Sequence, residues 1–154
     1  MLTVEDLNRL LRQRTWDKEC NLWIGPEKQL QTALEGVQTE TIDLLDLFDQ
    51  DNLPIEDDEV RQHLARSLRQ KLRSMPATSH QHRVLIVRSA GLLARYEVGT
   101  REFYDWYCDD FSMVFLLIEG QSAESRWPDE VDCDPDRLIA SFVDASLIKQ
   151  QFCG

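Results

Sequence analysis

The sequence lacks the features that mark membrane proteins, secreted proteins and disulfide frameworks. No apolar stretch approaches the roughly 18 residues that a membrane span requires. Residues 1–6 lack the basic and then apolar order of a signal peptide. The four cysteines, Cys20, Cys108, Cys133 and Cys153, are widely spaced and form no C-x-x-C pair. We therefore expect a soluble, cytoplasmic protein with reduced thiols.

Positive charge is also scarce, with 17 Lys and Arg against 28 Asp and Glu and a net charge of -11. The excess of acidic over basic side chains is unevenly distributed along the chain. Residues 1–55 carry 5 basic and 11 acidic side chains and residues 101–154 carry 4 and 12, whereas residues 56–88 carry 7 basic and 4 acidic. An acidic total repels phosphate backbones, so we do not expect direct binding of nucleic acid. A cationic partner protein is easier to accommodate.

A glycine-rich phosphate loop is missing. The segment 23–29 follows an expected strand, where such a loop would lie, but it has a single Gly, a carboxylate (Glu27) in place of the phosphate, and Gln after its Lys. The strand 84–87 then delivers Arg88 where a nucleotide hydrolase needs Asp for its metal. We therefore expect no nucleotide hydrolysis. A degenerate phosphate site at Gly25–Lys28 is the alternative.

Two apolar runs, Val84–Val87 and Met113–Ile118, are the strongest structural signal, and with their flanking residues they predict strands from Arg83 to Arg88 and from Ser112 to Ile118. Continuous apolar runs between polar residues indicate strands buried on both faces, as in parallel sheets covered by helices. Asn21–Ile24 and the start of Thr41–Phe48 are further strand candidates. Strands therefore alternate with helices. The pattern predicts a single three-layer α/β domain over 1–154, with a mostly parallel sheet of about four strands and a P-loop-like topology without the phosphate loop.

Helix boundaries follow from capping residues and apolar spacing. In the long helix, acidic residues at the start and basic residues at the end favour the helix dipole, and one apolar stripe recurs every four residues. The predicted helices run from Thr3 to about Arg14, from Pro26 to Gly36, from Glu56 to Arg73, over part of 89–97, from the cap Thr100 to about Asp109, and from Pro135 past Val143.

Metal and thiol chemistry have weak signals. The run 132–136 offers oxygens at alternate positions as calcium loops do, but Arg137 replaces the required Gly and Val143 the final Glu, which favours a solvated acidic loop. His80-x-His82 beside Cys108 has no fixed zinc spacing, and a buried, inert thiol is the more common state of such a cysteine. We therefore expect no catalytic residue, metal or cofactor.

Aromatic residues gather in 103–115, which holds six of the thirteen in the chain. Phe103 and Tyr107 lie one helical turn apart and Trp106 shares their side, while Tyr104 falls elsewhere, so one narrow stripe cannot bury all four. Exposed Tyr and Trp beside charged side chains such as Glu102 are typical anchors of a protein interface. The alternative is an aromatic core covered by the C-terminal segment.

The long helix carries a basic set at 61, 66, 69, 71 and 73. Basic side chains near the end of a helix complement its dipole, so a solvated face explains them without any partner. The alternative is a docking site for an acidic partner or a phosphate backbone.

A family resemblance rests on three short segments: the strand, turn and helix from about residue 20, the sequence Val84-Leu-Ile-Val-Arg-Ser-Ala-Gly-Leu-Leu93, and Val114-Phe-Leu-Leu-Ile-Glu-Gly120 after the aromatic helix. Over roughly 20–120 the chain resembles the small accessory proteins of BREX phage-defence systems, the BrxB and BrxF types. BrxF-type proteins resemble AAA-like ATPases, but this chain lacks their phosphate loop. BrxB-type proteins lack it too and act as partners of larger defence proteins, so the resemblance implies an adaptor.

These observations predict a non-catalytic accessory protein that acts by protein–protein interaction with a larger subunit of a prokaryotic anti-phage defence complex; a homodimer stays open. Alternatives are a degenerate, AAA-like nucleotide-binding regulator and a nucleic-acid-binding accessory protein that uses the basic helix. The predicted partner-binding residues are Phe103, Tyr104, Trp106 and Tyr107 on the aromatic helix and Arg61, Arg66, Arg69 and Arg73 on the basic helix.

Overall fold

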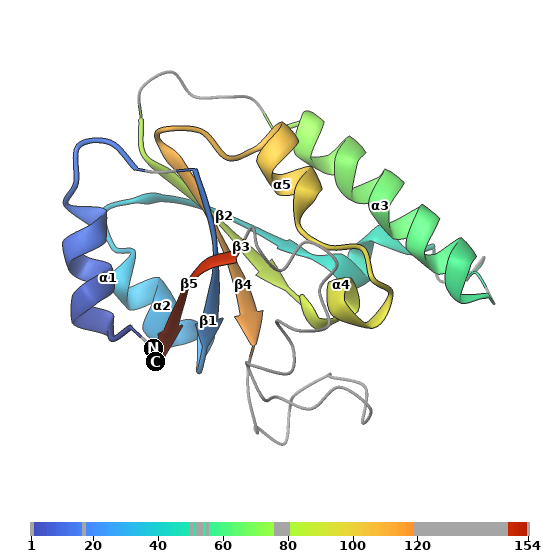
Figure 1. The fold of residues 1–154 in the computed structure, drawn as a ribbon, viewed down its shortest axis with the longest axis horizontal. Coiled ribbons are helices and arrows are strands. Elements are labelled where there is room, and N and C mark those ends of the chain that lie inside the picture. Colours follow the sequence, from blue (N-terminus) through green and yellow to red (C-terminus); the bar gives the residue numbers. More distant parts are fainter. Residues whose placement is uncertain are drawn as a thin grey trace.

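A parallel sheet of five strands forms the centre of the molecule, in the order β2-β3-β4-β1-β5 (Figure 1). The computed structural model describes residues 2–16, 18–49, 51, 54, 56–75, 81–118 and 148–153. The predicted α/β class is confirmed, with five strands in place of about four. The strands are β1 (Glu19–Ile24), β2 (Gln38–Asp43), β3 (Arg83–Arg88), β4 (Ser112–Ile118) and β5 (Ile148–Cys153).

Helices cover both faces of the sheet and make it the middle of three layers (Figure 1). α1 (Val4–Leu11) and α2 (Glu27–Ala33) pack on one face, and α3 (Asp57–Arg73), α4 (Gly91–Arg95) and α5 (Arg101–Trp106) on the other. A short 3-10 helix, η1 (Leu44–Leu47), follows β2. Alternate residues of β4 serve the two cores: Phe115 packs with the α1/α2 side, and Leu116 packs with the α3/α5 side.

The two strongest apolar runs became β3 and β4, the latter buried along its whole length. Both strands have the predicted bounds. They occupy interior positions between β2 and β1, where each backbone pairs on both edges and side chains meet helices on both faces. Burial on both faces is the reason that the runs are continuous instead of alternating.

The turn from β1 into α2 is fixed by local contacts. Gly25 has φ 138, which favours glycine, and its amide donates to the Ile118 carbonyl at 3.1 Å. The Trp23 indole N–H donates to the Pro26 carbonyl at 3.1 Å. Pro26 precedes the first helical residue instead of being it, since α2 begins at Glu27.

Helix starts were predicted better than helix ends. The Thr3–Asp6 capping box is present, but α1 ends at Leu11 and not near Arg14. α5 follows Thr100 but ends at Trp106, and the Thr100 hydroxyl makes no cap; it is buried without a partner within the described ranges. Thr100 therefore holds the predicted N-cap position, but without the side-chain hydrogen bond of a cap.

The fifth strand was not predicted. Its sequence, Ile148-Lys-Gln-Gln-Phe-Cys153, is half polar, as suits a strand at the edge of the sheet, where β5 pairs with β1 and Phe152 forms one further bridge with Leu2. Phe152 is fully buried and meets the ring of Phe115 edge-on at 5.8 Å. The helix predicted from Pro135 and the acidic run 132–136 lie outside the described residues. Among the described helices, none is long and apolar enough to cross a membrane.

Candidate functional site

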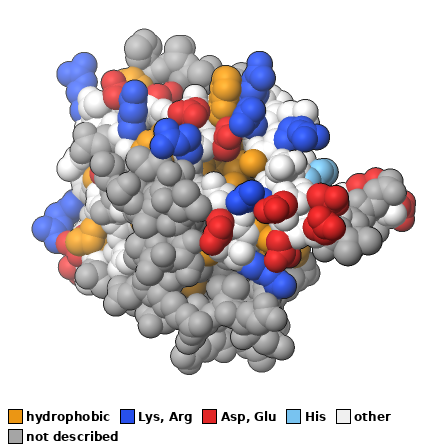
Figure 2. Space-filling model, turned by 45° about the vertical axis from the view of Figure 1, so that its right-hand side comes forward, with side chains coloured by type: hydrophobic (Ala, Val, Ile, Leu, Met, Phe, Trp, Pro, Cys, Tyr) orange, Lys and Arg blue, Asp and Glu red, His pale blue; other side chains and the backbone are white. Residues whose placement is uncertain are grey.

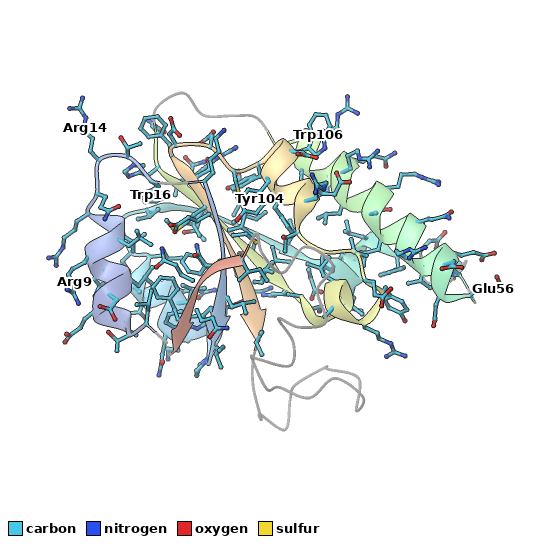
Figure 3. The ribbon with its side chains drawn as sticks, viewed as in Figure 1. Arg9, Arg14, Trp16, Glu56, Tyr104 and Trp106 are labelled. Atoms are coloured by element: carbon cyan, nitrogen blue, oxygen red, sulfur yellow. The ribbon has the colours of Figure 1, made fainter. Side chains whose placement is uncertain are left out.

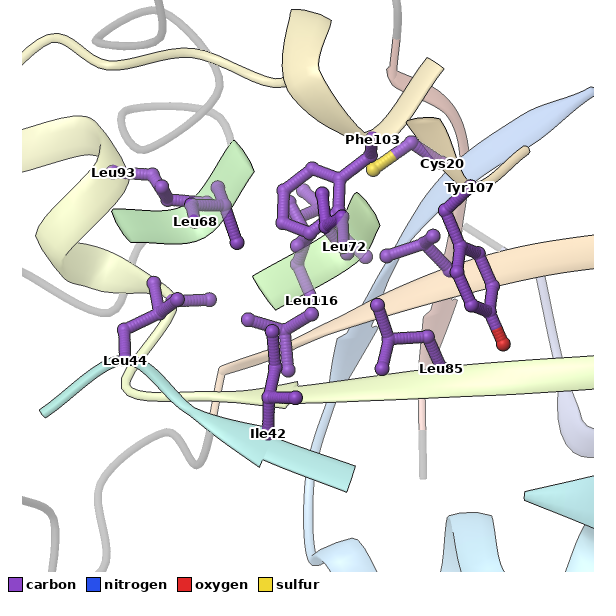
Figure 4. Close-up of a cluster of buried hydrophobic side chains, with 14 of the residues drawn as sticks. Cys20, Ile42, Leu44, Leu68, Leu72, Leu85, Leu93, Phe103, Tyr107 and Leu116 are labelled. Carbon is purple, nitrogen blue, oxygen red and sulfur yellow. The ribbon is translucent and has the colours of Figure 1, made fainter. Parts of the chain in front are cut away.

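α5 packs beside the carboxyl-terminal half of α3, so the predicted aromatic and basic surfaces lie next to each other (Figure 1). Two of the predicted docking residues are nevertheless in the core. Phe103 is 0% exposed and Tyr107 2% exposed, and both belong to the buried cluster that also contains Cys20, Leu72 and Leu85 (Figure 4). The expectation that Phe103 and Tyr107 contact a partner is therefore corrected. They are one turn apart, and that pair is the stripe that α5 presents to the sheet.

Tyr104 has a structural contact. Its hydroxyl accepts a hydrogen bond from the Cys20 amide at 3.0 Å, at the position where the register between β1 and β5 shifts. The side chain is half-buried, and this burial raises its pKa. Tyr104 reaches toward the sheet while Trp106 lies at the rim (Figure 3). Tyr104 thus lies on the sheet side together with Phe103 and Tyr107, whereas we had grouped Trp106 with these two and placed Tyr104 elsewhere.

Trp106, one of the aromatic residues that the sequence assigned to an interface, has an exposed side chain. It is 41% exposed, and its indole N–H donates to Glu102 Oε2 at 3.1 Å. The Arg73 guanidinium carbon lies 4.8 Å from the centre of its ring. A cation over an aromatic face is attracted by the ring's negative π surface. The indole is therefore held at the surface in one orientation by contacts on its edge and its face.

Glu102 joins the two helices. Arg69 donates to it through Nε at 3.1 Å and Nη2 at 2.8 Å, a bidentate pair. The hydrogen bonds with Glu102 and its negative charge raise the pKa of Arg69. The same carboxylate accepts from Trp106. We had treated Glu102 only as rim charge, because sequence spacing gives no signal of a contact between residues 33 positions apart.

Arg66 completes the surface. Arg66, Arg69 and Arg73 are spaced by three and four residues and so share one face of α3. Arg66 is exposed and has no ion-pair partner in the described part of the chain. Arg61 pairs instead with Asp58 at 3.2 Å, away from this face.

We call Arg66, Arg69, Arg73, Glu102 and Trp106 the α3/α5 surface. In the space-filling view, Lys and Arg side chains gather along the upper part of the molecule with exposed apolar atoms between them (Figure 2). An exposed indole surrounded by arginines can stack on an apolar or planar group and bind carboxylates beside it.

The carboxyl ends of the strands, where sheets of this kind bind ligands, hold an internal ion pair. Glu27, the first residue of α2, accepts from Arg88 at the end of β3, with Nη2 to Oε2 at 2.7 Å. Since β4 lies between β1 and β3, the pair spans the end of β4. The Ser89 hydroxyl donates to Asp43 at 2.7 Å. A carboxylate already neutralised by arginine thus stands where a phosphate would lie.

Cys20 and Cys108, the cysteines whose side chains the structure describes, are buried free thiols. Burial raises the pKa of Cys108 to about 12 and raises that of Cys20 as well, which favours the protonated form of both thiols over the nucleophilic thiolate. The Nε2 atom of His82 bonds to the Arg14 carbonyl at 2.9 Å. The described ranges hold no group of three or more His, Cys, Asp or Glu that could bind a metal. His80 lies outside them.

Comparisons of the chain with protein-family models, with curated proteins and with solved structures gave no match. Its function is therefore inferred from the contacts above. Of the eight predicted docking residues, the structure brings Arg66, Arg69, Arg73 and Trp106 together. It places Phe103, Tyr104, Tyr107 and Arg61 in other roles.

Proposed function

We propose that this protein is a non-catalytic accessory subunit that works in the cytoplasm by protein–protein interaction, docking through the α3/α5 surface onto a larger protein. The resemblance of residues 20–120 to BREX accessory proteins supports a partner from a prokaryotic anti-phage defence complex. The observation that carries the proposal is the exposed Trp106, held by Arg73 and Glu102 beside two further arginines.

Preorganisation supports an interface at this position. Ordering a large side chain on binding costs about 0.5 to 1.5 kcal/mol. Trp106 already has a cation on its face and an acceptor at its N–H, so little of that cost remains. Exposed Trp and Arg are also the residue types that dominate binding energy at protein interfaces.

Charge complementarity indicates the chemistry of the partner. Arg66 and Arg73 have no carboxylate partner among the described residues, and they lie in the segment 56–88 that is basic within an acidic protein. The partner therefore presents an acidic segment next to an apolar group that covers Trp106. Opposite charges at such a contact set its register and speed its formation.

Affinity purification from the native host tests the proposal, followed by calorimetry with the purified partner. We expect wild type to bind an acidic surface of a larger defence protein, with weaker binding as salt rises from about 0.1 M to about 1 M. Trp106→Ala and the double variant Arg66→Glu/Arg73→Glu should each weaken binding by at least about tenfold, or roughly 1.4 kcal/mol.

Leu45→Ala is the matched control, because Leu45 is an exposed apolar residue, 37% exposed, on η1. It should bind the partner like wild type. An unchanged partner and affinity in Trp106→Ala would rule the α3/α5 surface out. Capture that nuclease treatment abolishes would instead identify nucleic acid as the ligand of the arginines.

A further inference from the structure

An open cavity of about 480 Å³ lies at the amino-terminal edge of the sheet, opposite the edge that holds Glu27 and Arg88. The segment after α1 forms one side of it, and the residues before β3 and β4 form the other. Its volume falls within the range of about 300 to 1,000 Å³ found for small-molecule sites. It is lined by Leu11, Arg12, Gln13, Arg14, His82 and Phe111.

Two unneutralised cations distinguish this cavity. Arg12 and Arg14 are exposed, and neither guanidinium has an ion-pair or hydrogen-bond partner in the described ranges. By contrast, Arg9 on the preceding helix pairs with Asp6. In a chain with net charge -11, two arginines that are two positions apart and have no carboxylate partner in the described ranges favour an anionic ligand.

Two aromatic rings, those of His82 and Phe111, line the same cavity as the two cations. His82 lies flat on the fully buried Trp16, with ring centres 3.9 Å apart and planes 15° apart, and Phe111 lies 5.6 Å from His82. The Trp16 amide donates to the Asp110 carbonyl at 2.7 Å, which fixes the base of the stack. Arg14 extends outward from the loop while Trp16 lies inside it (Figure 3).

The histidine ring is oriented by its backbone contact. Because a carbonyl only accepts, the 2.9 Å contact with the Arg14 carbonyl places a hydrogen on Nε2 of His82. Nδ1 then has no partner among the described residues. The cavity thus combines two exposed cations, an oriented imidazole whose Nδ1 has no partner among the described residues, and the apolar side chains of Leu11 and Phe111.

We propose that this cavity binds a small anion carried on a flat ring, such as an aromatic carboxylate or an aryl phosphate. Arg12 and Arg14 bind the anionic group, and the ring packs against Phe111 and the edge of His82. The site is independent of the α3/α5 surface and of the Gly25–Lys28 turn. Its failure would leave the proposed docking function untouched.

Two-dimensional NMR titration of the full chain tests the site with defined probes. Phenyl phosphate and benzoate are the ligands, and inorganic phosphate and benzyl alcohol supply the charge or the ring alone. We expect saturable shifts of the amides of residues 11–14, 82 and 111 and of the Trp16 indole. Binding of the charge-only and ring-only probes should be at least about tenfold weaker. The tighter of the two ring anions identifies the anionic group.

The double variant Arg12→Gln/Arg14→Gln should lose about tenfold or more in affinity while unfolding at the same urea concentration, because both side chains are exposed. Arg9→Gln is the matched control and should bind like wild type. The proposal is overturned by any of three results: no saturable shifts with either ring anion, equal binding of inorganic phosphate, or unchanged affinity in the double variant.

Discussion

Tyr104 replaces a missing strand contact. Between Cys20 and Asn21 the β1–β5 register shifts, and a shift of this kind interrupts the ladder and leaves a backbone group unpaired. The Tyr104 hydroxyl accepts a hydrogen bond from the Cys20 amide at this position. An aromatic residue that sequence reasoning assigned to an interface therefore satisfies a buried backbone donor.

Tyr104→Phe should lower the free energy of unfolding by about 1 to 2 kcal/mol, because the Cys20 N–H would lose its acceptor. Urea unfolding followed by circular dichroism measures the change. Tyr96→Phe is the control on a partly exposed tyrosine and should differ from wild type by less than about 0.5 kcal/mol. Equal effects of the two substitutions would contradict the structural role of Tyr104.

Buried thiol and phenol groups make the protein sensitive to alkali. Burial raises the pKa of Cys108 from its ordinary 9.0 to about 12 and also raises the pKa values of Tyr104 and Tyr107. Above about pH 9 the unfolded chain releases the Cys108 proton while the folded protein retains it. The unfolded state then binds fewer protons, so the stability contributed by the protonated thiol is present below pH 9 and is lost as pH rises toward 12.

We expect the urea midpoint to fall between about pH 8 and about pH 10.5, and to fall less in Cys108→Ala. Each variant is compared with itself at the lower pH, so that any loss of packing cancels. The role of the Cys108 proton would be refuted by parallel pH curves for wild type and the variant.

At the scale of elements, β5 completes the sheet. β1 carries apolar residues on both faces, and with β5 in place its backbone is paired on both sides. An unpaired apolar strand at a sheet edge is an aggregation risk. Phe152 anchors β5 by packing on Phe115, and the amide of Leu2 donates to Gln151 beside it.

Phe152→Ala should destabilise the protein by about 3 to 5 kcal/mol, through lost apolar burial and the cavity left beside Phe115. Gln151→Ala, on the same strand with a partly exposed side chain, should cost less than about 0.5 kcal/mol. Denaturant midpoints of the two variants give the comparison. A cost near zero for Phe152→Ala would show that β5 contributes little to the fold.

At the scale of the whole molecule, the protein's own side chains occupy the carboxyl-terminal edge of the parallel sheet, where sheets of this kind bind ligands. The Glu27–Arg88 ion pair crosses the end of β4, and the Asp43 carboxylate accepts a hydrogen bond from the Ser89 hydroxyl. Phosphate would have to displace a carboxylate already bonded twice to arginine, and a second carboxylate nearby adds repulsion.

Calorimetry with ATP and magnesium should therefore give no saturable heat and no hydrolysis. The measurement uses the full chain, with Lys28→Ala as the comparison for the degenerate turn. Saturable heat near one ATP per chain that disappears in Lys28→Ala would establish the nucleotide-binding alternative instead.

The sequence by itself determined the fold class and most element starts. β3 and β4 were found at their observed bounds because strands buried on both faces must be apolar throughout. The stripe of Val60, Leu64, Leu68 and Leu72 gave α3 for the same reason, since helical spacing turns burial into a pattern. Sequence periodicity was sufficient to locate an element wherever its buried residues recur at regular spacing along the chain.

Only the tertiary structure decided which side chains are surface and which are core. Whether Phe103, Tyr104 or Trp106 faces the sheet depends on how α5 packs against α3. The sequence did not predict β5, because an edge strand needs few apolar residues. The Arg69–Glu102 and Glu27–Arg88 pairs join residues 33 and 61 positions apart. Such contacts depend on how the elements pack in three dimensions, so the spacing of residues along the sequence does not predict them.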